Sequence, residues 1–445
     1  MIERSITIDL SKKGVKVKPL SGVCLGPLFD TEPRIDLSEE YSELAIPIVR
    51  TGMYDAPAGS VCFLDIHNIF PDAALDERFP ESYDFKLADE YMASIKNVGA
   101  DIYLRLGESR DKYSHNPTRP HVSYEKWARI AEKIILHYNK GWGRGAKYSV
   151  KYVEIWPGAD KPGAFTSRED YFEFYRTVAT HLKGAFPTLK VGGYSSGGFA
   201  SLNRYDASDE ERGYVDFLEH FLAYITDKDT SAPLDFLSWE CRADSAEELS
   251  LHSNYAKNYL LQYKLKKTLS IVSSLKLECE TNPRLSRDYP ARLATALIVA
   301  SDANIDMMFY SSLHPYSPDN AVITVDDCEN KHKYGAYAVL SAFGTLMKHG
   351  SVVSTSDNFR REIYSLATAS DSGAAIMVAT ANYSGTLKIA IKGSPFTRYS
   401  IKGMLGGGKR GVGYSTAQEN LPLGIGSLTL KVGRCEIYLI TLSNP

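Results

Sequence analysis

Charged and aromatic side chains stand where several short apolar runs of this chain end. Arg50 closes the run IPIVR, Glu108 follows DIYLRLG, Trp156 follows YVEI, and Glu240 follows LDFLSW. A carboxylate can give or take a proton or act as a nucleophile, a guanidinium group binds hydroxyl oxygens, and an aromatic face packs against an apolar ring face. Mixed side chains of this kind suit a sugar, whose rings have apolar faces and hydroxyl edges.

Metal and cofactor chemistry have little support in the sequence. The ten histidines are dispersed, without an HExxH or HxH motif, and the six cysteines lack the short paired spacings of zinc sites. We therefore expect neither a metal site nor a bound cofactor. The scattered cysteines are more simply explained as reduced thiols of a cytoplasmic protein.

The elements that must position these side chains form a regular alternation. From residue 21 to about residue 350, short β-branched or apolar runs alternate with longer segments of helical periodicity, giving roughly eight β/α units. This pattern predicts an α/β fold in which residues 21–350 form a (β/α)8 TIM barrel with insertions. Functional residues of such barrels lie at the carboxyl ends of the strands, so we expect the side chains above to gather at one mouth. The expected strands are 22–28, 46–52, 101–107, 152–156, 190–194, 234–240, 269–274 and 305–312.

The pattern changes after Gly350. Residues 351–445 contain short alternating strands separated by turn residues, which is typical of a β-sandwich. The segments ITIDL and VKVKPL within residues 1–20 also read as strands. We expect them to complete the C-terminal β-sandwich domain from the other end of the chain.

The composition is that of an ordinary globular protein. Among 445 residues, 44% are hydrophobic, and 51 Lys and Arg nearly balance 54 Asp and Glu, for a formal net charge of -3. Without a basic stretch, the chain gives no reason to expect a nucleic acid or an anionic membrane as partner. The first residues lack the apolar core of a secretory signal, so we expect a cytoplasmic protein, with a removed leader left open. Homo-oligomerisation is left open as well.

Eight segments of the predicted barrel carry a resemblance to known enzymes. They are IPIVRTGMYDAP (46–57), DIHNIFPD (65–72), SYDFKLADEYMASIKNVGADIYLRLGES (82–109), YEKWARIAEKIILHYNKGW (124–142), YVEIWPGAD (152–160), YFEFYRTVATHLKGAFPTLKVGG (171–193), LDFLSWECRADSAEEL (234–249) and KYGAYAVLSAFGTL (333–346). On these segments, which cover nearly the whole barrel, the chain resembles glycoside hydrolase family 39, the β-xylosidase and α-iduronidase group of retaining barrel enzymes. The resemblance implies a TIM barrel accompanied by a β-sandwich, and a small carbohydrate as ligand.

The resemblance breaks at the two catalytic positions. Retaining glycosidases use two carboxyl groups about 5–5.5 Å apart, one as acid/base and one as nucleophile. In the family the acid/base is the Glu of an Asn-Glu-Pro run closing strand four, and Gly158 occupies that position in EIWPGAD. The nucleophile is the Glu that ends strand seven, and a gap-free count from SWECR places Ser274 there. We therefore expect standard retaining hydrolysis to be lost or strongly impaired.

Other carboxylates at the strand ends are candidates to replace the missing pair. Glu240 is the leading candidate, because it ends a strand at the barrel mouth and Arg242, on the same side of that strand, would keep it ionised. The alternative is a plain Glu240–Arg242 ion pair that fills an emptied pocket. Asp160 lies two residues past Gly158 and could act only if the glycine lets the backbone approach closely.

Some of the mouth residues have competing interpretations. Trp156 and Trp239 either offer flat faces to a sugar or cap the barrel core. His67 either touches the ligand or braces its own loop. The residues expected to bind substrate are Arg50, His67, Glu108, Trp156, Asp160, Trp239, Arg242 and Tyr310, with Glu240 as the candidate catalytic residue.

Three functional hypotheses follow, each from a different class. In the first, the barrel binds or senses a glycan without cleaving it. In the second, it is an active glycoside hydrolase that uses relocated carboxylates, with Glu240 in the leading role. In the third, it is a non-catalytic scaffold subunit whose pocket is filled by its own side chains.

Overall fold

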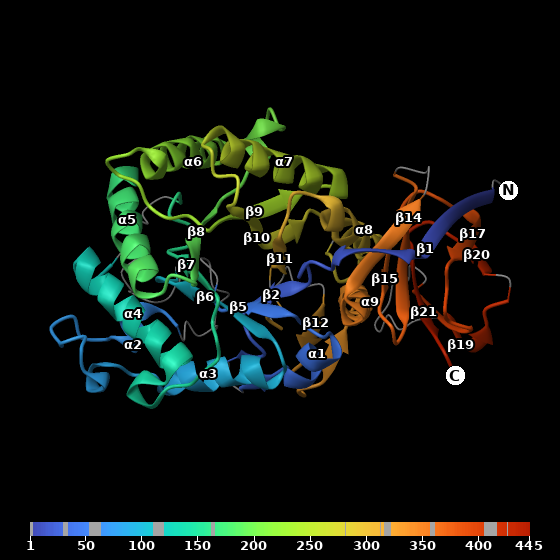
Figure 1. The fold of residues 1–445 in the computed structure, drawn as a ribbon, viewed down its shortest axis with the longest axis horizontal. Coiled ribbons are helices and arrows are strands. Elements are labelled where there is room, and N and C mark those ends of the chain that lie inside the picture. Colours follow the sequence, from blue (N-terminus) through green and yellow to red (C-terminus); the bar gives the residue numbers. More distant parts are fainter. Residues whose placement is uncertain are drawn as a thin grey trace.

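The protein consists of a closed barrel wrapped by helices and a separate large β-sheet, with both chain ends at the sheet (Figure 1). This arrangement confirms the predicted fold class. The computed structural model describes residues 3–29, 34–52, 64–109, 120–161, 165–280, 282–311, 313–315, 322–356, 361–404, 416–424 and 426–445.

Eight parallel strands close the barrel in the order β10-β11-β2-β5-β6-β7-β8-β9. Their runs are almost entirely buried, as expected for parallel strands covered on both faces. Residues such as Ile48, Tyr103 and Phe236 fill the interior as a compact cluster. The strands are β2 (Gly22–Cys24), β5 (Ile48–Arg50), β6 (Asp101–Leu106), β7 (Tyr152–Ile155), β8 (Lys190–Ser196), β9 (Phe236–Ala243), β10 (Leu269–Leu277) and β11 (Met307–Tyr310).

Helices surround the barrel, and several begin with a serine cap. The side chains of Ser123, Ser167, Ser208 and Ser245 each accept a hydrogen bond from a backbone N–H in the first turn of the following helix. Within the part of the chain described above, no helix combines the length and apolar character needed to cross a membrane. The helices are α1 (Ser38–Glu43), α2 (Ile66–Ile69), α3 (Lys86–Asn97), α4 (Tyr124–Lys140), α5 (Arg168–Ala185), α6 (Asp209–Thr226), α7 (Ala246–Gln262), α8 (Tyr289–Asp302) and α9 (Gly335–His349), with 3-10 turns η1 (Pro80–Ser82), η2 (Trp142–Arg144) and η3 (Ala200–Leu202).

The second unit is a nine-stranded sheet in the order β19-β18-β21-β16-β15-β14-β1-β17-β20. Residues from distant strands of this sheet, including Ile8, Ile376 and Ile389, form one core cluster, so the sheet folds over and encloses it. Its outer face, through side chains such as Met377 and Leu439, joins the barrel core. The strands are β1 (Glu3–Lys16), β14 (Ser351–Ser356), β15 (Ile363–Ala369), β16 (Ala374–Thr380), β17 (Gly385–Lys392), β18 (Arg398–Met404), β19 (Thr416–Pro422), β20 (Ser427–Val432) and β21 (Glu436–Ser443); two small sheets pair β3 (Leu28–Phe29) with β4 (Ile35–Asp36) and β12 (Ile323–Val325) with β13 (Lys331–Lys333).

The N-terminal segment joins this sheet as one long strand rather than the two expected. β1 pairs antiparallel with β14 and parallel with β17. Its register with β14 shifts between Asp9 and Lys13 and again before Lys16. These irregularities absorb the interruption that the sequence pattern shows around Gly14, because a bulge inserts extra residues without ending a strand.

Candidate functional site

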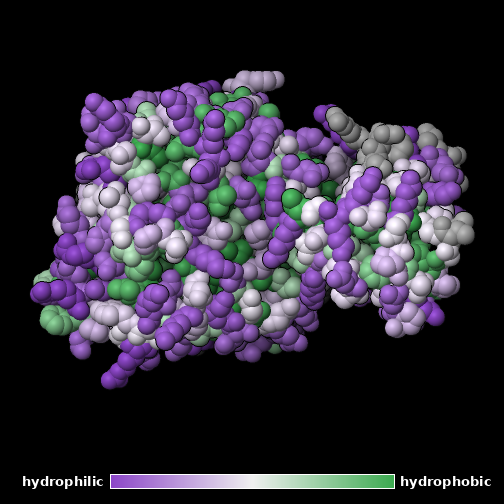
Figure 2. Space-filling view, in the orientation of Figure 1, coloured by the Kyte–Doolittle hydropathy of each residue, from purple (hydrophilic) through white to green (hydrophobic). Residues whose placement is uncertain are grey.

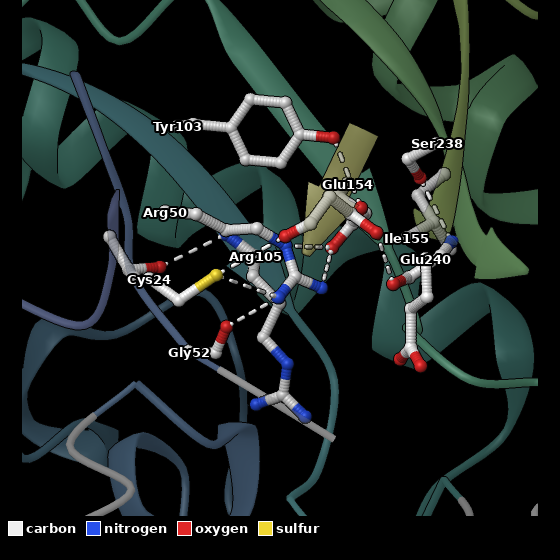
Figure 3. Close-up of polar contacts among 12 residues, drawn as sticks. Cys24, Arg50, Gly52, Tyr103, Arg105, Glu154, Ile155, Ser238 and Glu240 are labelled. Carbon is white, nitrogen blue, oxygen red and sulfur yellow. Dashed lines mark hydrogen bonds and ion pairs between the residues drawn. The ribbon is translucent and has the colours of Figure 1, made fainter. Parts of the chain in front are cut away.

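A buried ion pair lies inside the barrel below its carboxyl end (Figure 3). The Nε and Nη2 atoms of Arg50 donate to Oε2 of Glu154 over 2.9 and 2.5 Å, and Nη1 donates to the carbonyl of Gly52 over 2.7 Å. The Tyr103 hydroxyl donates to the other Glu154 oxygen over 3.0 Å. The side chains of Arg50 and Glu154 are 2% and 0% exposed. Arg50, expected as a ligand contact, is therefore committed to an internal network.

A second charged network joins the loops that follow β5 and β6. Arg105 donates through Nη1 to Asp65 over 2.5 Å and through Nη2 to the carbonyl of Glu108 over 2.5 Å. Asp65 also accepts hydrogen bonds from the backbone N–H and the hydroxyl of Ser109, over 2.7 and 2.9 Å. This network ties Asp65 to the end of β6 and to the two residues that follow the strand, Glu108 and Ser109.

His67 belongs to the same region and bonds to Glu108. Its Nδ1 contacts one Glu108 oxygen and its backbone N–H donates to the other. Burial raises the pKa of Glu108 to about 7. Asp65, His67 and Glu108 together have the donor types of a metal site. However, all four carboxylate oxygens already accept hydrogen bonds from Arg105, Ser109 or His67, so we interpret this group as a brace between loops.

The aromatic side chains expected at the mouth lie in the core. Trp156, Trp239 and Tyr310 are 1%, 0% and 3% exposed. The two tryptophans therefore cap the barrel core, as one of the two interpretations held, and do not offer their faces to a sugar. Trp156 packs against Trp127, Phe165 and Phe174, Trp239 contacts Phe199 and donates to the Ser270 hydroxyl, and Tyr310 shares a hydrogen bond with Tyr289.

The loop after β7 has an unusual backbone at Gly158. This residue has a φ of +70°, and its N–H donates to the carbonyl of Tyr194 over 2.6 Å. Trp156, two residues earlier, also has a positive φ of +50°. An L-residue in the left-handed region costs about 1–2 kcal/mol. A glutamate could therefore occupy position 158 only with strain, or with a different course of the loop.

Ser274 lies beside Glu240 on neighbouring strands. The two are paired in the parallel register of β9 and β10, just after a shift of register that follows Val272. Adjacent strands are about 4.8 Å apart, so Glu240 stands one strand away from Ser274. Ser274 is half-buried, whereas the preceding Ser273 is buried and hydrogen-bonds the Ser195 hydroxyl over 2.7 Å.

Glu240 does not pair with Arg242, so the prediction of a Glu240–Arg242 ion pair is wrong. Oε1 of Glu240 instead accepts from Nζ of Lys161 over 3.0 Å, and Arg242 pairs with Glu278 over 2.8 Å. Residues two apart on a strand are about 6.6 Å apart, and each finds a nearer partner on a neighbouring segment. The side chain of Glu240 is 27% exposed, and its carboxylate points away from the Arg50–Glu154 pair (Figure 3).

Asp160 lies next to Lys161 and in the same part of the mouth. Its Oδ2 accepts from the backbone N–H of Gly197 over 2.8 Å. The residue as a whole keeps some solvent contact, but its Oδ1 is enclosed and has no hydrogen-bond partner. Burial raises the pKa of Asp160 to about 7, and the charge of Glu240 adds to this rise while Gly197 and Lys161 oppose it. The pKa of Asp160, like that of Glu108, therefore lies near neutral pH.

Asp160 should make stability depend on pH. Because its pKa is about 7 in the folded protein and 3.8 in its ordinary state, the folded chain binds the proton more tightly. Protonated Asp160 therefore stabilises the folded state at low pH. The free energy of unfolding falls as pH rises from about 4 to about 7, by about 1.4 kcal/mol for each pH unit. Urea unfolding should show that the free energy of unfolding falls more between pH 5 and pH 8 for the wild type than for Asp160→Asn. Equal falls in the two proteins would contradict this assignment.

The sequence analysis missed several residues that organise the mouth. Lys161 belongs to no sequence motif, and its contact with Glu240, on a strand 79 residues later, is visible only in the structure. Arg105 and Glu154 lie inside their strands, where alternation could have shown that they point inward.

One family model matches the chain. The model of the family "Glycosyl hydrolases family 39" matches residues 65–289, about half of the chain. No curated protein matches the chain.

Solved structures similar to this one include a glucosidase from Croceicoccus marinus, with a TM-score of 0.80, 17% identity and 100% of both chains covered. A GH39 enzyme from Xanthomonas axonopodis pv. citri has a TM-score of 0.70 and 14% identity, with 99% of this chain and 97% of that chain covered. A monomeric β-xylosidase from Caulobacter crescentus has a TM-score of 0.67 and 13% identity, with 99% of both chains covered. At these identities the likeness establishes a shared fold.

Proposed function

This chain belongs to glycosyl hydrolase family 39, and from that premise we propose that it binds a glycan or glycoside at the barrel mouth without the two-glutamate hydrolysis of the family. The family fold supplies the barrel, and the Arg105–Asp65 ion pair ties the end of β6 to the residues before α2. Half-buried polar groups remain at the barrel mouth. Glu240 and Lys161 offer a carboxylate and an ammonium group, both of which hydrogen-bond sugar hydroxyls.

The observation that carries the proposal is the pair of residues at the expected catalytic positions. Gly158 has no side chain, and Ser274 has a hydroxyl group where a carboxylate would be needed. The left-handed backbone and the N–H bond of Gly158 support a loop adapted to glycine. Without a proton donor and a nucleophile at these places, the double displacement of retaining enzymes has no route through them.

Calorimetry should test binding on a panel of β-xylosides and of α- and β-glucosides, with their oligosaccharides, because similar structures are named a β-xylosidase and a glucosidase. We expect measurable binding by the wild type and roughly 10- to 150-fold weaker binding by Glu240→Gln, because a charge-assisted hydrogen bond is worth about 1.5–3 kcal/mol. Turnover of nitrophenyl β-xyloside by the family's route should be absent.

The matched control is Asp235→Asn. Asp235 is also a partly buried carboxylate bonded to a lysine, Lys183, over 2.9 Å, and it precedes β9 at the opposite end of the barrel. It should bind like the wild type. No binding across the panel would reject the proposal and leave the scaffold hypothesis. Rapid turnover with retention of the anomeric configuration would contradict the loss of the standard route.

A further inference from the structure

Two tyrosines on the segment that follows β8 lie near the barrel mouth. Tyr205 is in the loop between β8 and α6, and Tyr214 is in the second turn of α6. Connections that follow the strands of a barrel lie at its carboxyl end, which is the mouth. Because Trp156 and Trp239 are buried in the core, these two tyrosines are the better candidates for contact with a sugar ring.

Tyr214 lies against the glycine turn that also contacts Asp160 and Glu240. A Cβ added at Gly197 would be 2.3 Å from the ring of Tyr214, so the ring occupies the space of a side chain there. The N–H of Gly197 donates to Asp160, and a Cβ at Gly198 would be 2.3 Å from the carbonyl oxygen of Glu240. Burial raises the pKa of the Tyr214 hydroxyl, and the charges of Asp160 and Glu240 add to this rise. The partly exposed ring therefore lies beside the polar groups of the mouth.

Tyr205 is 96% exposed, although the backbone on both sides of it is fixed. Arg204 donates two hydrogen bonds, each over 2.9 Å, to the carboxylate of Glu248 at the start of α7. The carbonyl of Ala207 accepts a hydrogen bond from Arg212 over 2.6 Å. An aromatic side chain on a fixed backbone loses little conformational freedom when a ligand binds, which favours affinity. Tyr205 is thus a prepared contact surface outside the group around Gly197.

The surroundings of Tyr205 carry an excess of negative charge. Residues 204–212 contain two arginines and four acidic residues, Asp206, Asp209, Glu210 and Glu211. Both arginines already donate to oxygens of the protein. This segment repels an anionic ligand, whereas a neutral sugar can pack its apolar ring face on the tyrosine without that cost.

We propose that the mouth binds a neutral oligosaccharide of more than two units, with one sugar ring stacked on Tyr214 beside Glu240 and a later ring on Tyr205. The inference rests on the glycan binding proposed above and names the class of ligand. Glu240 and Lys161 bond hydroxyl groups of the first ring. The two tyrosines contribute ring contacts at separate places, one at the glycine turn and one next to the Arg204–Glu248 ion pair, so a ligand that uses both must extend along the segment.

The test is calorimetry with neutral xylo-, cello- and malto-oligosaccharides of two to six units. We expect the affinity of the wild type to rise with length. Tyr205→Ala should weaken the binding of the longer oligosaccharides roughly tenfold, the loss of about 1.4 kcal/mol of ring contact, and leave that of the disaccharides unchanged. Tyr214→Ala should weaken binding at every length by a similar factor. Tyr205→Phe and Tyr214→Phe should bind like the wild type, because both keep the ring.

The matched control is Tyr263→Ala. Tyr263 is a partly exposed tyrosine directly after α7, at the opposite end of the barrel, and its replacement should leave every affinity unchanged. Oligosaccharides of equal length that carry uronic acid units should bind more weakly than the neutral ones, and high salt should reduce this difference. Circular dichroism should show that each variant is folded. If Tyr214→Ala is not, Tyr205→Ala decides, since replacing an exposed side chain seldom affects the fold.

The outcomes separate this inference from the proposed function. An affinity that does not depend on length, or tyrosine variants that bind hexasaccharides like the wild type, would overturn the inference, while binding that is weakened by Glu240→Gln would leave the proposed function standing. Tighter binding of the uronic acid oligosaccharides would overturn the neutral class of ligand. Absence of binding at every length would overturn both proposals together.

Discussion

Replacing Glu154 by glutamine should lower the free energy of unfolding by about 3–5 kcal/mol, because it leaves a charged guanidinium group unpaired inside the barrel. Arg50 and Glu154 are almost completely buried and joined by two hydrogen bonds. Glutamine keeps the size and one acceptor of the side chain, so the loss reports the charge and not the packing. Chemical denaturation followed by circular dichroism would measure it.

The double variant Arg50→Met/Glu154→Met is the control for this prediction. It removes both charges and keeps similar volume, and replacing a buried ion pair by apolar residues is often neutral or even stabilising. It should therefore be much more stable than Glu154→Gln. A Glu154→Gln protein as stable as the wild type would show that solvent or another group compensates Arg50.

Truncating Trp156 to alanine should destabilise the fold by about 3–5 kcal/mol. The indole is 1% exposed and packs against Trp127, Phe165 and Phe174 in the main core. Since this cluster joins β7 to α4 and α5, the cavity would loosen the wall that carries Gly158. Thermal and urea unfolding would measure the loss.

Phe79→Ala offers a comparison for Trp156→Ala. Phe79 is 54% exposed, and surface replacements usually change stability by no more than about 0.5 kcal/mol. A Trp156→Ala protein that kept its full stability but lost sugar affinity would contradict the structural role and favour a ring at the binding surface. The affinity measured for Trp156→Ala must therefore be corrected for the fraction of the protein that is folded.

The sequence predicted the fold well because fold and sequence pattern share a physical cause. Buried parallel strands must be continuous apolar runs, and the helices that cover them must have one apolar face, so the alternation up to residue 350 could be read directly. The change after Gly350 to short alternating strands marked the second sheet in the same way. The single long strand β1 was missed, because a bulge leaves the same pattern as a turn.

The site was predicted less completely, because strand ends show where a side chain is but not which neighbour it meets. Glu240 and Arg242 share one side of a strand, but they do not pair. Glu240 forms an ion pair with Lys161 and Arg242 with Glu278, and both partners lie on other segments. Trp239 was also expected at a strand end, but β9 continues to Ala243, and the indole packs in the core and donates to Ser270. Such choices depend on tertiary distances that no local pattern contains.

The place of β1 in the second sheet has a consequence for how the chain is made. Thr7 pairs with Ser356, so the first strand must wait until about 350 further residues have been synthesised, roughly 20–70 seconds at 5–20 residues per second. During that interval Ile6, Ile8 and Leu10, all buried in the finished protein, lack their partners on β14 and β17. The nascent barrel therefore leaves the ribosome with an unpaired apolar strand attached, which is a natural target for a chaperone until the last domain emerges.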